Sequence, residues 1–360
     1  MLARIFNDLV AWGILAGFGG LAFLLALIFK GNFNTSDPAP SVGDSMLRGL
    51  EAFILAIVGG LAARAFISIL LGAANDSPAG GLAVGWGFFL VPGIVDTIPY
   101  LTHHPPILTS VSSLLMFATV VGGFSGAMNG LWRIYAWDGL GWVACPLDMT
   151  WGLAGNTIGC LLHAINFAWG NHGDEDRTNA HRYASGFGMK TDYAFTQGAV
   201  MSNLSYGPGQ DLYNHEMTHV WQNRAFGPMY TLTYLGWMVV WLVPSLVAAA
   251  IVQVIAAPLY WCYFNNPWET WAYVVQNQDR AAFANTPDEK KLVFSTTWVA
   301  IASALFFLVA ITFAVLTVKS VWIDKGASAN PPTTHSTAPG KNKTGGHPPR
   351  KPAPAPAKGH

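Results

Sequence analysis

The sequence predicts a mainly α-helical, polytopic membrane protein with about six to eight membrane helices and one small α+β domain. Of its 360 residues, 52% are hydrophobic and only 11% are charged, whereas about a quarter of the residues of a soluble globular protein are charged. Several apolar segments have the length of roughly 20 residues that a helix needs to cross the hydrocarbon core of a bilayer. One central segment is polar rather than apolar, because charged and turn-forming residues are concentrated in it.

The N-terminal part, residues 1–169, predicts about five of these membrane helices. The expected spans are residues 9–29, 51–73, 82–101, 108–131 and 150–169. The third contains two prolines and Asp96, so we expect it to be interrupted. Arg64 in the second span is also ionisable, and ionisable groups at membrane depth mark either a functional pathway or a charge pair. Pairing of Arg64 with Asp96 is the simpler expectation.

The remainder of the chain divides by composition. Residues 170–228 hold most of the central charge and predict the small water-facing domain. Residues 229–262 are apolar, a polar segment follows at residues 263–292, and a last span is expected at residues 293–322. Residues 323–360 are rich in proline, lysine, threonine and glycine, and this composition predicts disorder.

The charge of the chain limits its partners. The formal net charge is zero, so no basic field points to nucleic acid, and the lipid bilayer is the expected partner. The three cysteines, Cys145, Cys160 and Cys262, are too widely spaced to suggest a disulfide framework or a Cys-x-x-Cys motif.

The placement of basic residues predicts an orientation, because positive loops stay on the cytoplasmic side. Arg4, Arg133 and the basic tail fall on one side if each of the five early segments crosses once. This count makes the C-terminal tail cytoplasmic and the polar domain extracytoplasmic, although Lys30 and Arg48 oppose it.

The sequence His-Glu-Met-Thr-His contains the strongest chemical signal. His215 and His219 are four residues apart, which places both imidazoles on one face of a helix, one turn apart, where they can bind one metal ion. Glu216 projects toward the same ion without needing to ligate it, and can act there as a catalytic base toward water. The alternative is a helix whose histidines make ordinary surface hydrogen bonds.

A catalytic Zn²⁺ site needs three protein ligands and one open position. Glu269, expected in the first turn of a helix after an Asn-Pro pair, is the leading third ligand. Its alternative role is to complement the dipole of that helix. The other candidate ligands are His172, His181 and Asp279.

These residues resemble the gluzincin branch of the zincin metallopeptidases, in which a glutamate on a later helix completes the His-Glu-x-x-His site. The resemblance covers mainly residues 193–280, and it implies bound zinc and a peptide or protein substrate. It also implies that residues 193–203 form a strand along which an extended peptide binds. One departure is Tyr273, which stands four residues after Glu269 where the family has an aspartate.

The third ligand has a consequence for topology, because His219 and Glu269 must lie on the same side of the bilayer to share one ion. Residues 229–262 therefore must enter the membrane and return, and we expect two helices that meet near Pro244. Such a hairpin holds the zinc site against the membrane surface. The expected function is a membrane-embedded zinc metallopeptidase, and the alternatives are a membrane protein with a structural zinc, or a channel or transporter.

Overall fold

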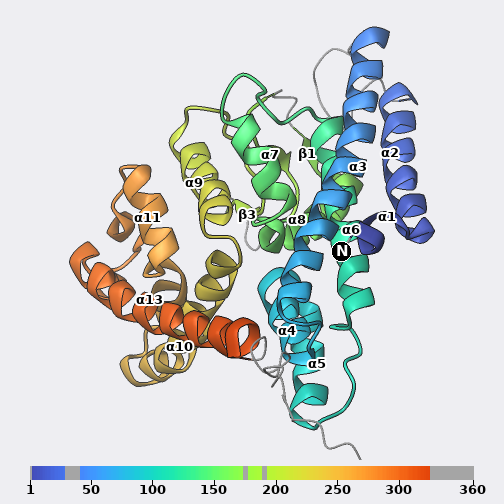
Figure 1. The fold of residues 1–360 in the computed structure, drawn as a ribbon. Helices are drawn as coiled ribbons and strands as arrows, with labels where there is room; N and C mark the ends of the chain where they lie inside the picture. Colours follow the sequence, from blue (N-terminus) through green and yellow to red (C-terminus); the bar gives the residue numbers. More distant parts are fainter. Residues whose placement is uncertain (1, 29–40, 173–176, 189–192, 325–360) are drawn as a thin grey trace, which may run out of the picture.

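The computed structural model describes residues 2–28, 41–172, 177–188 and 193–324 (Figure 1). The chain is mainly helical, with 73% helix and 4% strand. Residues 325–360 of the predicted disordered tail lie outside the described part. The N-terminal helices are α1 (Leu2–Phe6), α2 (Leu9–Ile28), α3 (Val42–Ala73), α4 (Pro78–Val84), the π-helix η1 (Gly85–Phe89), α5 (Val91–Leu101), α6 (Val111–Leu131), α7 (Gly141–Met149) and α8 (Leu153–Trp169).

The remaining elements form the polar domain and the C-terminal helices. They are β1 (Asn171–His172), β2 (His181–Ser185), β3 (Phe195–Gln197), β4 (Val200–Ser202), α9 (Asp211–Phe226), α10 (Pro228–Val252), η2 (Leu259–Phe264), α11 (Pro267–Val275), η3 (Arg280–Phe283), α12 (Pro287–Lys291), α13 (Thr296–Val318) and η4 (Lys319–Asp324).

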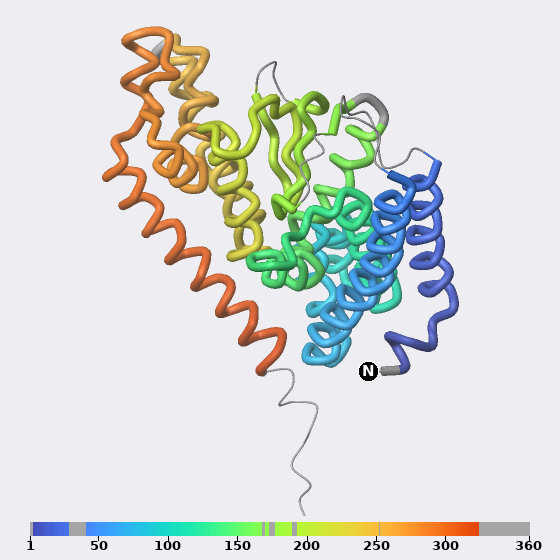
Figure 2. The backbone as a smooth tube through the Cα atoms, turned by 90° about the horizontal axis from the view of Figure 1, so that it is seen from above, coloured from blue at the N-terminus to red at the C-terminus, as the bar shows by residue number. Residues whose placement is uncertain are grey.

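Helices α2, α3 and α6 pack side by side as a bundle, whereas α13 lies on the other side of the molecule (Figures 1 and 2). Glycines allow α3 and α6 to approach each other closely. A Cβ atom on Gly122 of α6 would lie 2.5 Å from the carbonyl oxygen of Gly59 in α3 and 2.7 Å from the Cβ atom of Ala63. Small residues of this kind allow two membrane helices to approach closely.

Five helices of the described chain are long and apolar enough to cross a membrane, which is consistent with a multi-pass membrane protein. They cover Leu9–Ile28, Val42–Ala73, Val111–Leu131, Pro228–Ile251 and Thr296–Ile323. The predicted span at residues 82–101 is interrupted, as expected, because Leu90 adopts a φ of 55° ahead of Pro92. The segment expected at residues 150–169 forms the 17-residue helix α8, which is not among these five.

The expected pairing of Arg64 with Asp96 is wrong. The Arg64 guanidinium instead donates to the Asp8 carboxylate at 2.7 Å, at the start of α2. Asp96 accepts from the Leu108 amide and from the Thr109 hydroxyl, both at 2.8 Å, and so closes the loop before α6. Arg64 and Asp96 are therefore each satisfied by other partners, as buried charges require.

The small sheet has the order β1-β2-β4-β3, so β3 lies at its edge. Strands β3 and β4 pair antiparallel across Gly198, whose φ of 59° suits glycine. Strand β2 pairs parallel to β4, with His181 opposite Val200. Helices α8 and α9 both contact this sheet, so β3 lies directly beside the helix that carries the His-Glu-Met-Thr-His sequence.

A buried ion pair fixes the C-terminal end of α9. Two guanidinium nitrogens of Arg224 donate to the two carboxylate oxygens of Asp148 in α7, each at 2.8 Å. The two side chains are 0% and 1% exposed. The Tyr135 hydroxyl also donates to Asp148, at 3.0 Å. Because loss of one partner would leave a buried charge uncompensated, this pair ties α9 firmly to α7.

The apolar segment after α9 does return, but not at the predicted position. Helix α10 continues through Pro244 as far as Val252, so the expected break at Pro244 is wrong. A proline inside a membrane helix is tolerated where neighbouring groups satisfy the backbone. The chain turns at Gln253, which has a φ of 55°, and η2 then packs back along α10. The Trp237 indole donates to the carbonyl of Trp261 at 3.2 Å across this turn.

We predict that Gly122→Ala destabilises the bundle, because its new methyl group would meet the backbone of α3. Overpacking of this kind costs about 1–3 kcal/mol. Gly17→Ala in α2 is the matched control, since nothing lies within 4 Å of a Cβ atom there. Thermal unfolding of the detergent-solubilised variants measures the difference. Equal unfolding temperatures for the two variants would contradict this packing.

Candidate metal centre

Two helices position the three predicted ligands. His215 and His219 lie one turn apart on α9 and are 2% and 5% exposed. Glu269 lies in the first turn of α11, which begins at Pro267 and is capped by the Asn266 side chain, an acceptor for the backbone N–H of Trp268 at 3.1 Å. This Asn-Pro start has a fixed backbone geometry. It directs Glu269 toward α9.

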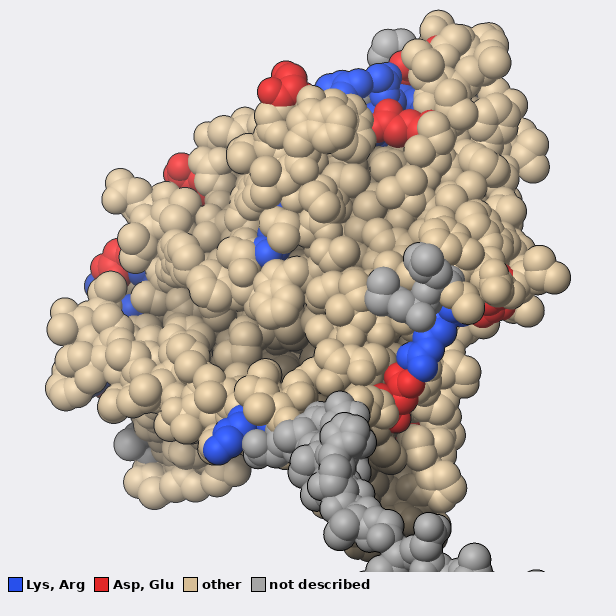
Figure 3. Space-filling model, in the orientation of Figure 1, with Lys and Arg blue, Asp and Glu red and all other residues tan. Residues whose placement is uncertain are grey.

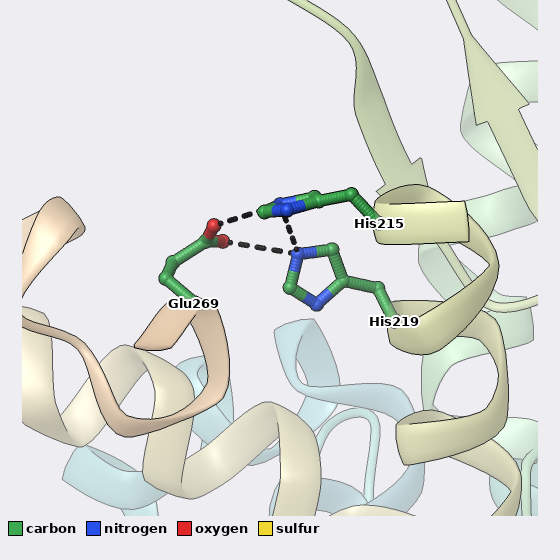
Figure 4. A group of neighbouring side chains, drawn as sticks. All are labelled: His215, His219 and Glu269. Atoms are coloured by element: carbon green, nitrogen blue, oxygen red, sulfur yellow. Dashed lines mark hydrogen bonds and ion pairs between the residues drawn. The ribbon is translucent and has the colours of Figure 1, made fainter. Parts of the chain in front are cut away.

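The three side chains converge on one point (Figure 4). The Nε2 atoms of His215 and His219 are 3.2 Å apart. The two Glu269 oxygens lie 3.2 Å from Nε2 of His215 and 3.3 Å from Nε2 of His219. Ligand atoms about 2.0–2.1 Å from a tetrahedral ion are separated by about 3.3 Å. The group therefore has the spacing to hold a metal ion.

Amide side chains set which nitrogen of each histidine faces this point. The Gln222 amide nitrogen donates to the carbonyl of Trp268 at 3.1 Å, so its oxygen faces Nδ1 of His219 at 2.9 Å. Nδ1 must therefore carry a proton, and Nε2 is the nitrogen that faces Glu269. The Gln276 oxygen lies 3.0 Å from Nδ1 of His215 and serves the same purpose. Partners of this kind orient metal-binding histidines.

The first turns of α10 also touch the centre. The Tyr234 hydroxyl donates to Oε1 of Glu269 at 2.7 Å. The ring of Tyr230 lies 6.4 Å from that of His219. Both tyrosines belong to the candidate membrane span that begins at Pro228. The centre thus lies beside the beginning of a membrane-length helix.

His219 and Glu269 stabilise each other's charged forms. Burial disfavours the imidazolium of His219, but the Glu269 carboxylate outweighs this effect and raises the pKa of His219 to about 9. Burial likewise opposes ionisation of Glu269, yet the two histidines hold the pKa of its carboxyl well below the ordinary value. At neutral pH a metal ion therefore has to displace a proton from His219.

Glu216 adjoins the three ligands without joining them. It is 5% exposed, and its Oε2 accepts a hydrogen bond of 2.5 Å from the Thr196 hydroxyl of β3. Glu216 and His215 form part of the wall of a cavity of about 600 Å³. The remaining lining is mainly aromatic and amide: Tyr193, Ala194, Tyr206, Gln210, Asp211, Leu212, Tyr263, Tyr273, Gln276, Gln278 and Phe283.

The other candidate ligands lie elsewhere. His172 and His181 are hydrogen-bonded to each other at 3.0 Å, and His181 also contacts the Asn129 amide oxygen at 2.8 Å. Asp279 caps η3 by accepting from the backbone N–H of Ala281 at 2.9 Å. Among the described residues, His215, His219 and Glu269 are the one group of three such side chains close enough to share an ion.

Sequence reasoning missed the residues that support the ligands. Gln222 follows His219 by three residues and Gln276 follows Glu269 by seven, which are spacings that share a helix face. The single strand predicted at residues 193–203 is wrong, because the segment turns at Gly198 and forms the two antiparallel strands β3 and β4. Thr196 lies in β3, but strand alternation alone does not show which side chain meets α9.

No family model matches this chain, and no significant match was found among curated proteins or solved structures. The likeness to gluzincins therefore rests on the residues themselves.

We predict that zinc binding to the metal-free protein at pH 7 releases about one proton, because the pKa of His219 is about 9. The apparent affinity should rise about tenfold per pH unit from pH 7 and level off above the pKa of His219. Isothermal titration in two buffers with different ionisation enthalpies measures the proton count. Glu269→Gln should bind zinc more weakly and release fewer protons. Zinc binding without proton release at pH 7 would contradict the ion pair.

Proposed function

We propose that this chain is a membrane-embedded zinc metallopeptidase that hydrolyses peptide bonds of a membrane-associated or extracytoplasmic substrate. The observation that carries the proposal is the buried group of His215, His219 and Glu269, with Glu216 beside it on the wall of a cavity. A metal site built in this way has both a base and room for a substrate.

The donor set supports zinc. Two imidazole nitrogens and one carboxylate are ligands that catalytic zinc takes in peptidases, with the fourth position left open for water or substrate. A structural zinc site is usually closed by four protein ligands. The described residues offer three at this point, which supports a catalytic site over a structural one.

A zinc ion held here would acidify a water molecule and polarise the scissile carbonyl. Glu216 lies next to His215 in the chain and shares the cavity with it. Its carboxylate takes a proton from the attacking water and later gives that proton to the leaving amine. His215, His219 and Glu269 remain fixed during this transfer, since Gln276, Gln222 and Tyr234 respectively bind each of them.

Two features support a peptide substrate close to the membrane. Strand β3 is at the edge of the sheet, beside α9, and its outer side has no partner strand among the described residues. An extended chain can add to such an edge through main-chain hydrogen bonds. In addition, Tyr234 links the centre to the second turn of a candidate membrane span. A substrate anchored in the bilayer would meet the centre at this depth.

A channel or transporter has less support. Arg64 and Asp96 suggested it, and both are engaged in hydrogen bonds that account for their burial.

We predict that Glu216→Gln keeps about one equivalent of zinc but lowers peptide hydrolysis by about 10²–10⁴-fold, the usual contribution of a general base. Glu289→Gln, far along the chain and bonded to Tyr260, is the control and should leave hydrolysis unchanged. Quenched fluorescent peptides and elemental analysis of the purified protein measure the two quantities. Full zinc occupancy with no hydrolysis by the wild-type protein would favour a structural metal.

A further inference from the structure

The hydrogen bond between Thr196 and Glu216 joins two elements that meet at the metal centre. Thr196 is the middle residue of edge strand β3, where it pairs with Met201 of β4. Its side chain is 7% exposed, and its hydroxyl donates to Oε2 of Glu216 at 2.5 Å. A buried carboxylate needs hydrogen-bond donors, because an unsatisfied buried charge is costly.

Thr196 is the one described residue that donates a hydrogen bond to Glu216. The bond engages Oε2 and leaves Oε1 without a protein partner in the described chain. Because the terminal torsion of a glutamate side chain has a broad distribution, a fixed donor on one oxygen decides where the other oxygen points.

We propose that Thr196 is a positioning residue, which orients the Glu216 carboxylate so that Oε1 faces the attacking water. This inference rests on the proposed peptidase function. Strand β3 thereby sets the geometry of the base as well as the edge beside which a substrate would lie. A β-branched residue suits this task, since its stiff side-chain torsion holds the hydroxyl in one direction.

The test compares Thr196→Val, which keeps the shape and removes the hydroxyl, with Thr196→Ser, which keeps the hydroxyl. Thr196→Val should lower kcat about 10–100-fold, the range seen when a hydrogen-bond partner of a metal ligand is removed. KM and zinc content should stay within about twofold of the wild type. Thr196→Ser should recover most of the lost kcat.

Thr218→Val is the matched control. Its hydroxyl also lies at α9, but it bonds the carbonyl of Asn214 in the same helix. It lines a different groove from the one that contains Glu216. This variant should have wild-type kcat and zinc content.

A second readout does not require hydrolysis. Co²⁺ placed in the centre absorbs visible light, and its bands respond to the water and carboxylates around it. Thr196→Val should shift these bands in the same direction as Glu216→Gln, whereas Thr196→Ser and Thr218→Val should not.

The inference would be overturned if Thr196→Val kept wild-type cobalt bands or wild-type kcat. It would also be overturned if Thr196→Ser lost as much kcat as Thr196→Val, or if Thr196→Val lost its zinc. If the zinc-loaded wild type cleaves no peptide, the peptidase proposal fails, and the cobalt bands then decide the role of Thr196 on their own.

Discussion

The meeting of Glu269 with His215 and His219 is the contact on which the C-terminal half of the chain depends. The ligands come from two helices that are separated by the whole of α10, a candidate membrane span. A helix of this length would carry the chain about 37 Å away at 1.5 Å per residue. The turn at Gln253 and the return of η2 along α10 bring Glu269 back to α9. Without this return the three ligand atoms could not face one another.

An ion pair holds the C-terminal end of the same helix, α9. Arg224 and Asp148 pair in the interior, and α9 is thereby fixed to α7 while its histidines face α11. Buried ion pairs often contribute little net stability, but breaking one is costly. The main effect of this pair is therefore to fix the position of α9 relative to the N-terminal helices. The candidate metal centre thus lies between α9 and α11, with α10 and β3 beside it.

The grouping of His215, His219 and Glu269 could be predicted, because residues four apart share one face of a helix and a catalytic zinc site would need a third ligand. The position of the turn between α10 and η2 could not be predicted. Pro244 suggested a break, but a single missing N–H in an apolar helix is a small perturbation, and the left-handed residue at Gln253 gives no comparable signal in the sequence. Thr196 was also missed, because its role arises from tertiary contact between β3 and α9.

X-ray absorption at the zinc K edge of the purified wild-type protein tests the account most directly. A zinc ion held by His215, His219 and Glu269 should have about four nitrogen and oxygen neighbours at about 2.0–2.1 Å, with the outer-shell scattering of two imidazoles. His219→Ala should remove one imidazole from this signal. Sulfur neighbours at about 2.3 Å, or a wild-type spectrum without imidazole scattering, would contradict a centre made of His215, His219 and Glu269.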